Sequence, residues 1–385
     1  MGTARASREV PNTGVGLQSD TCRSAERARD GRCPTEVGHR CADLLLPTTR
    51  SQGMKRRELL AAAAATVAFP GRAFAGGADG APTVLLTADL ESHVAALDIA
   101  TGRIRRRIRT LPGPRSIESA FLSWAVVAHT SSGRLSIFDG RSLRVQRVVE
   151  GFREPRYTAV HPSRWPTERS PNGTALAYVT DSARREVVTV DVDRGRILWR
   201  TAVPGPARHI GIDGAGERLW TTLGSKAERV AVLDLEDARR PRLVRTFATP
   251  FLAHDVVVST AKGRPTHVWI TSGDERRIAV YEADGRRPVA VLTADAPPQH
   301  VAFRGGTAFV ASGDDGTVRL HSHNGVVLNE SRVPLGSYNV ALSWLGAVTP
   351  SLGRGTLALL DRDGGVRSVR QVARAAHDAC LVVST

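Results

Sequence analysis

The sequence predicts an all-β protein, a seven-bladed β-propeller, from two observations. First, seven short apolar segments each close on an acidic residue or, once, on serine, and a turn follows. Second, the last residues of these segments are separated by 41, 52, 43, 48, 40 and 39 positions, close to the length of one four-stranded blade. The seven segments are residues 94–98, 135–139, 187–191, 230–234, 278–282, 318–322 and 357–361.

The front of the chain differs from the repeats. Residues 54–75 are typical of an export signal, with Lys55-Arg56-Arg57, an alanine-rich apolar run and a small-residue cleavage site at 73–75. Adjacent arginines favour the twin-arginine type, although an ordinary secretory signal remains an alternative. Because Met54 stands directly before this signal, we expect residues 1–53 to be a non-native, disordered extension. The propeller would then be residues 76–385, exported to the cell envelope or the medium, with no membrane span after signal removal.

Each repeat contains, in order, an inner strand, a second strand, a polar hairpin turn, a third strand and an outer strand. Asp, Ser and Gly dominate the hairpin turns, as in Ser272-Gly-Asp-Glu275. The inner strands are predicted to begin near residues 116, 156, 208, 253, 299, 338 and 376. The first repeat lacks an inner strand and the last inner strand lacks partners, so the C-terminal segment should complete the first blade and leave no open sheet edge. Residues 161–173, with three prolines, are predicted to be a loop on the face opposite the hairpin turns.

The order of strands and turns resembles the YVTN-type propeller repeat family. The best local matches are Val187-Val-Thr-Val-Asp-Val-Asp-Arg-Gly-Arg196 and Ala95-Ala-Leu-Asp-Ile-Ala-Thr-Gly-Arg103, and the pattern extends over residues 82–385. The sixth repeat departs from it, since Ser322 replaces the aspartate. The resemblance implies a propeller that binds ligands, and its relatives include binding proteins, lactone hydrolases and metal-binding propellers.

Composition narrows the function without identifying it. The net charge is +15 and nearly all of the basic residues are arginine, which indicates a solvated arginine-rich surface or a face that binds polyanions. Nucleic acid is disfavoured as a partner, because aromatic residues make up only 5% of the chain and stacking platforms would need them. Cys380 is the one cysteine in the repeats and is predicted to be a small buried residue.

Aligning the inner strands places one residue of each repeat at the same level, near the propeller axis. Four of the seven are histidine, although the whole chain has only 11 histidines. We predict that this axial ring binds a ligand, and that its histidines can hold zinc or copper. The predicted axial ring is Glu118, Tyr157, His209, His254, His300, Asn339 and His377, and the predicted metal ligands are His209, His254, His300 and His377.

The alternatives differ in chemistry. The histidines could instead be structural, each hydrogen-bonded to a neighbouring turn, or they could surround ordered water. The sequence has no GxSxG, HExxH or P-loop motif, so a monomeric, non-enzymatic propeller binding a small molecule, a metal ion or a protein is the leading hypothesis. The alternative is a zinc or copper propeller that carries the metal or hydrolyses a lactone ring. No catalytic residue can be named from the sequence.

Overall fold

The computed structural model describes residues 80–384, except 168–169, 260–265 and 295. The predicted extension and export signal, residues 1–75, lie outside the described residues. Within them the secondary structure consists of strands and one short 3-10 helix, η1 (Thr130–Ser132), without an α-helix. Accordingly, none of the described segments is a helix long and apolar enough to cross a bilayer.

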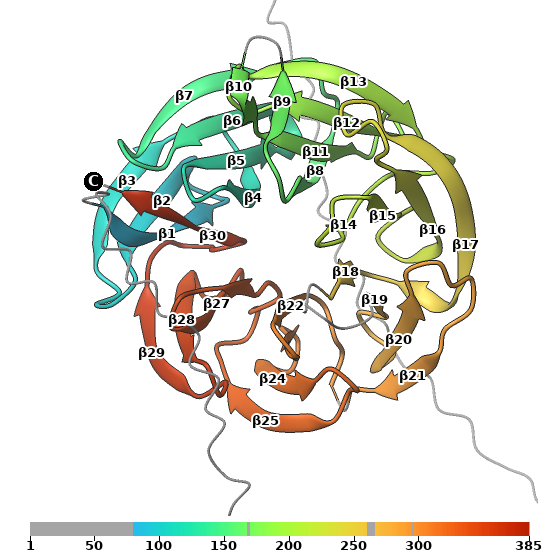
Figure 1. Cartoon of the computed structure of the whole chain (residues 1–385). Helices are drawn as coiled ribbons and strands as arrows, with labels where there is room; N and C mark the ends of the chain where they lie inside the picture. The colour runs from blue at the N-terminus through green and yellow to red at the C-terminus, as the bar shows by residue number, and fades with distance from the viewer. Residues whose placement is uncertain (1–79, 168–169, 260–265, 295, 385) are drawn as a thin grey trace, which may run out of the picture. The chain divides into compact units, whose positions relative to one another are not determined.

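The described strands form seven four-stranded antiparallel sheets arranged around a central axis, which confirms the predicted seven-bladed propeller (Figure 1). Each sheet is one blade, and its strands are named in order from the innermost to the outermost. Blade 1 contains β30 (Ala379–Ser384), β1 (Ala81–Ala88), β2 (His93–Asp98) and β3 (Ile104–Arg109). Blade 2 contains β4 (Pro114–Ala120), β5 (Trp124–His129), β6 (Arg134–Asp139) and β7 (Arg144–Val149). Blade 3 contains β8 (Pro155–Val160), β11 (Leu176–Asp181), β12 (Glu186–Asp191) and β13 (Arg196–Ala202).

The remaining four blades follow the same order. Blade 4 contains β14 (Ile210–Ile212), β15 (Arg218–Thr222), β16 (Ala227–Asp234) and β17 (Arg242–Ala253). Blade 5 contains β18 (Val256–Val258), β19 (His267–Thr271), β20 (Arg277–Glu282) and β21 (Ala290–Thr293). Blade 6 contains β22 (Val301–Arg304), β23 (Thr307–Ser312), β24 (Thr317–Ser322) and β25 (Val327–Arg332). Blade 7 contains β26 (Ala341–Leu342), β27 (Gly346–Pro350), β28 (Thr356–Asp361) and β29 (Val366–Gln371).

The third strands confirm the repeat that predicted the fold. All seven end at the predicted residues, from Asp98 in β2 to Asp361 in β28. Consecutive residues of these strands are buried on both sides; in β2, Val94, Ala95 and Ala96 have no exposed surface. Each sheet packs between two neighbouring sheets, so both of its faces are apolar and the strands lack polar alternation.

The ring closes as predicted, through the C-terminal strand. Strand β30 pairs antiparallel with β1, so that Leu85 lies opposite Cys380 and Val84 opposite Leu381. Leu381 packs in an apolar cluster shared with blade 7, while Cys380 and Val382 pack in one shared with blade 2. One strand therefore connects the two ends of the described chain and contributes to the core on both sides of blade 1. The buried Cys380 is a core residue, also as predicted.

The inner strands are shorter than predicted in blades 4 to 7. Strands β14, β18, β22 and β26 begin two to three residues later than expected, and β30 also begins at Ala379 rather than near Ala376. The outer strand β17 extends to Ala253, where the next inner strand was expected to begin. The residues before these strands still form hydrogen bonds to the second strand, but two threonine hydroxyls there replace part of the backbone ladder.

The insertion in blade 3 contains regular structure, so the prediction of a loop without strands was wrong. Residues 165–167 and 170–174 form a two-stranded sheet, β9 (Trp165–Thr167) and β10 (Ser170–Thr174). Both strands are edges of this sheet, where a proline costs no ladder hydrogen bond, and the prolines therefore hid the strand pattern. The insertion does lie at the predicted face, because it follows the end of β8 far from the hairpin turn after Asp181.

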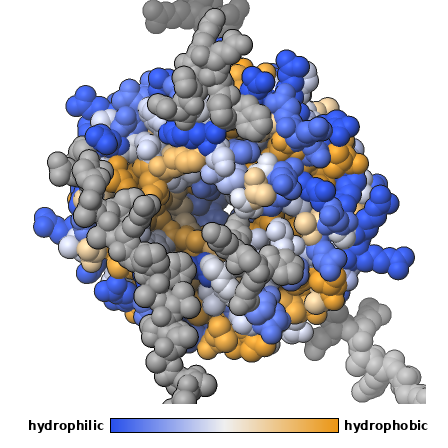
Figure 2. Space-filling model, in the orientation of Figure 1, coloured by the Kyte–Doolittle hydropathy of each residue, from blue (hydrophilic) through white to orange (hydrophobic). Residues whose placement is uncertain are grey.

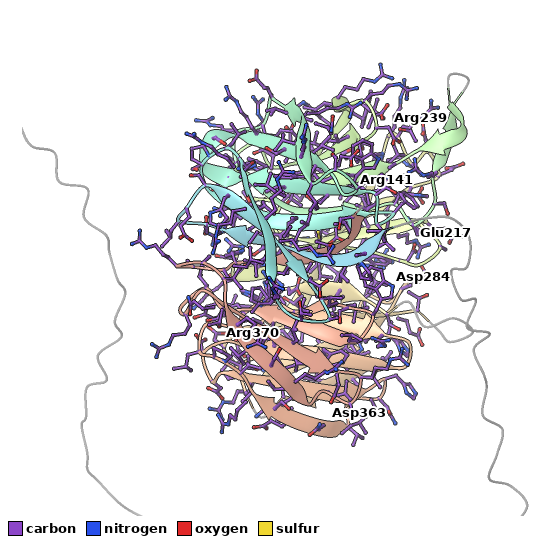
Figure 3. All side chains as sticks on the ribbon, turned by 90° about the vertical axis from the view of Figure 1, so that its left-hand side faces the viewer. Arg141, Glu217, Arg239, Asp284, Asp363 and Arg370 are labelled. Carbon is purple, nitrogen blue, oxygen red and sulfur yellow. The ribbon has the colours of Figure 1, made fainter. Side chains whose placement is uncertain are left out.

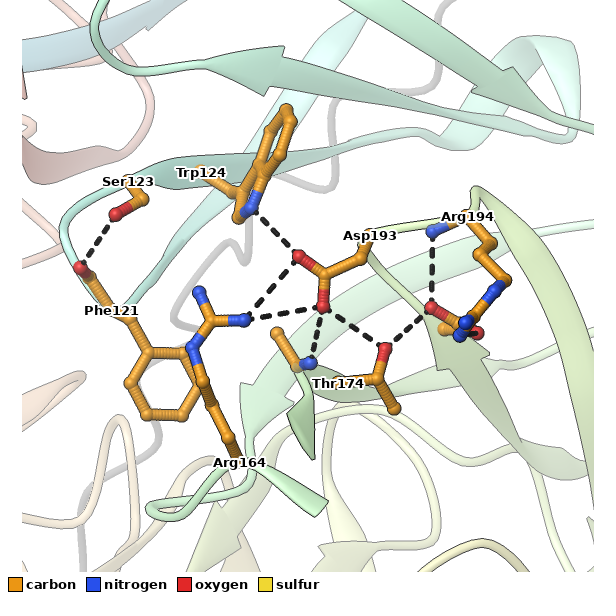
Figure 4. Close-up of polar contacts among 9 residues, drawn as sticks. Phe121, Ser123, Trp124, Arg164, Thr174, Asp193 and Arg194 are labelled. Atoms are coloured by element: carbon orange, nitrogen blue, oxygen red, sulfur yellow. Dashed lines mark hydrogen bonds and ion pairs between the residues drawn. The ribbon is translucent and has the colours of Figure 1, made fainter. Parts of the chain in front are cut away.

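One carboxylate anchors the insertion to blades 2 and 3 (Figure 4). Asp193 accepts hydrogen bonds from Trp124 Nε1 at 3.1 Å, from Thr174 Oγ1 at 3.0 Å and from the Ala175 backbone at 2.7 Å, and it pairs with Arg164 at 3.3 Å. The Arg164 guanidinium also lies over the Phe121 ring, 4.9 Å from its centre. These contacts fix one end of the insertion to the ring rather than leaving it as a separate projection.

The excess of arginine is spread over the outside of the ring. Figure 3 shows charged side chains of both signs around the perimeter, including Arg141, Glu217, Arg239, Asp284, Asp363 and Arg370. All six are exposed. This distribution fits the solvated surface, the first of the two interpretations of the charge. Figure 2 shows that the centre of the ring is hollow, with apolar surface along part of its border.

Candidate functional site

The backbone at the start of each inner strand sets the level of the axial residues. In blade 5, His254 N–H donates to Thr271 O at 2.7 Å and Thr271 N–H donates to Asp255 O at 3.1 Å. In blade 4 the same two bonds run from Arg208 N–H to Thr222 O and from Thr222 N–H to His209 O, so His209 is the equivalent of Asp255. In blade 6, Ala311 N–H donates to His300 O at 2.9 Å, so His300 shares this register. The prediction of one common register was therefore wrong for His254 and His377, which lie one residue earlier in their blades.

Buried threonines at the ends of second strands connect neighbouring blades at this level. Thr271 Oγ1 accepts from the Asp255 backbone at 3.1 Å and donates to Gln299 O of the next blade at 2.8 Å. Thr180 bonds in the same manner to Tyr157 and Arg208, and Thr87 to Asp378 and Arg115. Each of these hydroxyls has a donor and an acceptor in two blades, so it sets the distance between adjacent axial residues.

Replacing Thr271 by valine is therefore expected to destabilise the protein by about 1–3 kcal/mol and to loosen the position of His300. Valine fills the same space but leaves the Asp255 N–H and the Gln299 carbonyl without this partner in a buried site. Thermal and denaturant unfolding measure the effect, with Thr293→Val, an exposed residue of β21, as the matched control. Equal unfolding curves for both variants would show that the hydrogen bonds of Thr271 Oγ1 do not contribute to stability.

Three of the predicted histidines converge. One ring nitrogen each of His209, His254 and His300 lies within 4.8 Å of the others. The ring centres are 4.7 Å apart for His209 and His254, 4.9 Å for His209 and His300, and 5.4 Å for His254 and His300. Nitrogens that bind one zinc ion at 2.0–2.1 Å in tetrahedral geometry lie about 3.3 Å apart. Side-chain rotations that move each nitrogen by about 1 Å would therefore bring all three within bonding distance of one metal ion.

His209 is the most unusual of the three. Its side chain is only 1% exposed, and neither ring nitrogen has a hydrogen-bond partner among the described residues. The backbone of His254 lies near enough to interact weakly, but not at hydrogen-bonding geometry. Tyr157 packs against the ring at 4.1 Å between centres. A buried imidazole without partners is costly in a structural role, and it leaves a nitrogen lone pair free for a ligand.

The environment keeps the imidazoles of His209 and His254 neutral. Burial, reinforced by the other histidines, holds the pKa of His209 well below its ordinary value. Burial and His300 lower the pKa of His254 to about 4. A neutral imidazole is the form that binds a metal ion, so no proton has to be displaced from either residue at neutral pH.

Asp255 orients the third histidine. His300 Nδ1–H donates to Asp255 Oδ2 at 3.1 Å, which leaves Nε2 of His300 as the nitrogen with a free lone pair. Both side chains are about nine-tenths buried, at 11% and 10% exposed. A carboxylate that fixes the tautomer of a histidine is the usual support of a metal-binding imidazole. Asp255 follows His254 in the chain, but its side chain bonds to the histidine of the next blade.

The other predicted axial residues lie around the same channel but outside this cluster. His377 Nδ1–H donates to the Arg115 carbonyl at 2.9 Å, and Asn339 Nδ2 donates to the His377 carbonyl at 3.0 Å. His377 is not among the three histidines whose ligand atoms converge. Glu118 lies within β4 rather than before an inner strand, on the channel wall.

The axial residues divide the channel into two cavities. One, of about 420 Å³, is lined by Glu118, Asp255 and Asp378 together with apolar residues of the inner strands. The other, of about 430 Å³, lies on the side of the hairpin turns and is lined by Arg115, Arg208 and Lys226. Tyr157, His300 and Asn339 border both cavities. The second cavity is also lined by Asp274 and Asp314, so acidic side chains lie on both sides of the histidines and cationic side chains only on the side of the hairpin turns.

The arginines of this site did not stand out in the sequence. Arg115 is the second residue of β4, and Arg208 comes just before β14. The available signal was position, since Arg208 directly precedes the predicted axial residue His209. It was obscured by the abundance of arginine in the whole chain.

Two carboxyl groups on the channel wall hold protons more tightly than usual. Burial, with Asp378 nearby, raises the pKa of Glu118 to about 8. Burial also raises the pKa of Asp378 to about 6, although the Ile117 and Ala379 backbone N–H groups bond to its carboxylate and oppose the shift. Glu118 is consequently protonated in the folded protein at pH 7.

The contribution of Glu118 to stability is expected to fall as pH rises from about 4.5 to 8, because the unfolded chain loses the Glu118 proton in this range and the folded protein retains it. The Glu118→Gln variant removes this group, so the wild-type protein should lose stability relative to the variant as pH rises, by a few kcal/mol at most across the window. Urea unfolding of both proteins between pH 5 and 8 measures the difference. Parallel pH profiles would mean that Glu118 ionises normally.

Known structures share the fold at low sequence identity. Apo AztD from Citrobacter koseri superposes with a TM-score of 0.58 at 11% identity, covering 79% of this chain and 98% of AztD. Hydrazine synthase of Kuenenia stuttgartiensis gives 0.54 at 15% identity, covering 76% and 92% of the two chains. The dihydro-heme d1 dehydrogenase NirN, in complex with DHE, gives 0.56 at 13% identity, covering 77% and 74%.

These similarities support the propeller fold alone. By sequence, no family model and no curated protein matches the chain. The resemblance to YVTN-type repeats stays a prediction.

Proposed function

We propose that this protein is a metal-binding propeller that holds one zinc or copper ion at the axial cluster of His209, His254 and His300. The observation that carries the proposal is the convergence of three imidazole nitrogens within 4.8 Å, one of them on a buried ring without hydrogen-bond partners among the described residues. Neutral imidazoles and the Asp255 carboxylate behind His300 support it. Imidazole nitrogen is a ligand that suits both metals.

Binding and carriage of the metal fit this site better than hydrolysis. Three histidine ligands leave a coordination position open, as in catalytic zinc sites, but hydrolysis also needs a base to accept a proton from water. The nearby carboxyl groups do not offer a free one. Asp255 bonds to His300 and Glu118 is protonated at neutral pH. The Asp378 carboxylate is engaged by two backbone N–H groups. We therefore assign no catalytic residue and infer a carrier of the metal. We also propose that the protein is exported and acts as a single chain.

Titration of metal-free protein, purified without a histidine tag, tests the proposal. One equivalent of zinc or copper is expected to bind and to raise the melting temperature, because a ligand that binds only the folded state stabilises it. Elemental analysis after dialysis gives the stoichiometry, and parallel titrations rank the two metals. Absence of binding, with unchanged melting in either metal, would assign the cluster a structural role.

A further inference from the structure

Three arginines, Arg208, Arg115 and Arg156, lie close together on the side of the channel that faces the hairpin turns. Few acidic side chains pair with them. Arg208 forms no ion pair with a carboxylate among the described residues, and Arg115 has only Asp89 at 3.5 Å. Arg156, beside them, pairs with Glu154. The Nε–H groups of all three arginines are buried and lack hydrogen-bond acceptors within the described part of the chain.

This cationic group is partly desolvated. Burial is the main cause that lowers the pKa of Arg208, and the guanidinium groups of Arg156 and Arg115 lower it further, while the Tyr157 hydroxyl partly compensates. Like charges held together at reduced solvent exposure cost free energy unless an anion joins them. Arg208 and Arg115 both line the cavity of about 430 Å³ that also contains His254, His300 and His377.

The cavity already contains two acidic side chains, but both are engaged. Asp274 pairs with Lys226 at 3.1 Å, and Asp314 accepts from Gln299 Nε2 at 3.1 Å and from the Tyr338 hydroxyl at 2.9 Å. Neither neutralises Arg208. The donors that remain for a ligand are therefore the guanidinium groups, whose planar fork matches a carboxylate or a phosphate.

We infer that this cavity binds a small oxyanion, a carboxylate or a phosphate, through Arg208 and Arg115, directly beside the histidine cluster. The second part of the inference rests on the proposed function: the same anion supplies an oxygen atom to the open coordination position of the metal. Metal and anion would then bind cooperatively, because the anion offsets the repulsion between the metal ion and the arginines. Among the described residues, no arginine or lysine lines the cavity on the other side of the histidine layer, so the oxyanion is expected only on the side of the hairpin turns.

Equilibrium dialysis of metal-free protein with labelled phosphate and, separately, labelled oxalate at low ionic strength tests the anion site alone. The wild-type protein is expected to bind at least one of the two anions without metal. Arg208→Met should weaken binding at least 10-fold, whereas Arg367→Met, an exposed arginine of β29, should not change it. The ranking of phosphate against oxalate identifies the class of oxyanion. Arg208→Lys, which keeps the charge without the fork, provides a second variant if the methionine variant does not fold.

Zinc titrations with and without the tighter anion test the coupling. Zinc affinity is expected to rise at least 10-fold with the anion in the wild-type protein, and to remain nearly unchanged in Arg208→Met. If the wild-type protein and Arg208→Met bind both anions equally, or not at all, the inference is overturned whatever the zinc result. If zinc does not bind but the anion does, and depends on Arg208, the proposed function fails while the oxyanion site stands.

Discussion

Deletion of residues 376–385 is expected to abolish cooperative folding of the whole ring, rather than to remove a flexible end. The deletion removes β30, in which Ala379, Cys380, Leu381 and Val382 are all buried. Burying a side chain such as leucine or valine contributes about 1.5–3 kcal/mol, so the loss approaches the total stability of about 5–15 kcal/mol that is usual for a protein. It also exposes the edge of β1, where other chains can pair.

Circular dichroism during heating and size-exclusion chromatography measure this result. The truncated protein should show no sharp transition and should aggregate, and a synthetic peptide of residues 376–385 added during refolding should restore part of the transition. The matched control is Val369→Asp, an exposed position of the outer strand β29, which should melt near the wild type, whereas Val382→Asp should resemble the truncation. A truncated protein that melts like the full chain would show that the ring does not depend on this closure.

The sequence was sufficient for the architecture because the repeat is set by local chemistry. Each third strand is apolar on both faces and ends before a turn, so its last residue could be placed without knowledge of the fold. The inner strands were less predictable, since their first residues near the axis bond through threonine hydroxyls such as Thr271 Oγ1 instead of a regular ladder. No periodicity in the sequence encodes that exchange.

The sequence predicted that the axial residues surround one channel, but it did not predict which of their side chains come together. The repeat places His209 and His300 at one register, and His254, one residue earlier in its blade, joins them on a short arc. Which histidines face one another depends on side-chain directions, and His377 instead bonds to the Arg115 carbonyl. The partnership between Asp255 and His300 joins residues 45 positions apart in different blades, and a single sequence gives no sign of such a contact.

Alanine at His209, His254 or His300 is expected to weaken zinc binding by at least about 10³-fold, because each change removes one of only three protein ligands. Asp255→Asn should weaken it about 10- to 100-fold, since the ligand remains but its tautomer and orientation are no longer fixed. His377→Ala is the matched control from the same ring and should retain the wild-type affinity. Competition titrations against a zinc chelator measure all five variants, and equal loss in His377→Ala would place the metal elsewhere.

Replacing His209 by leucine separates a functional histidine from a structural one. In the metal-free protein the His209 ring is buried with both nitrogens unpartnered among the described residues, so His209→Leu should lower the cost of burial and raise the melting temperature by a few degrees while zinc binding is lost. His129 is equally buried, but its Nδ1 lies 3.3 Å from the Pro112 carbonyl and its Nε2 lies 3.3 Å from the Thr110 hydroxyl. His129→Leu should therefore destabilise the protein and leave zinc affinity unchanged. If His209→Leu stabilises the protein and His129→Leu destabilises it, His209 is retained for the ion it binds, at the expense of stability. If both substitutions destabilise the protein, His209 has a structural role.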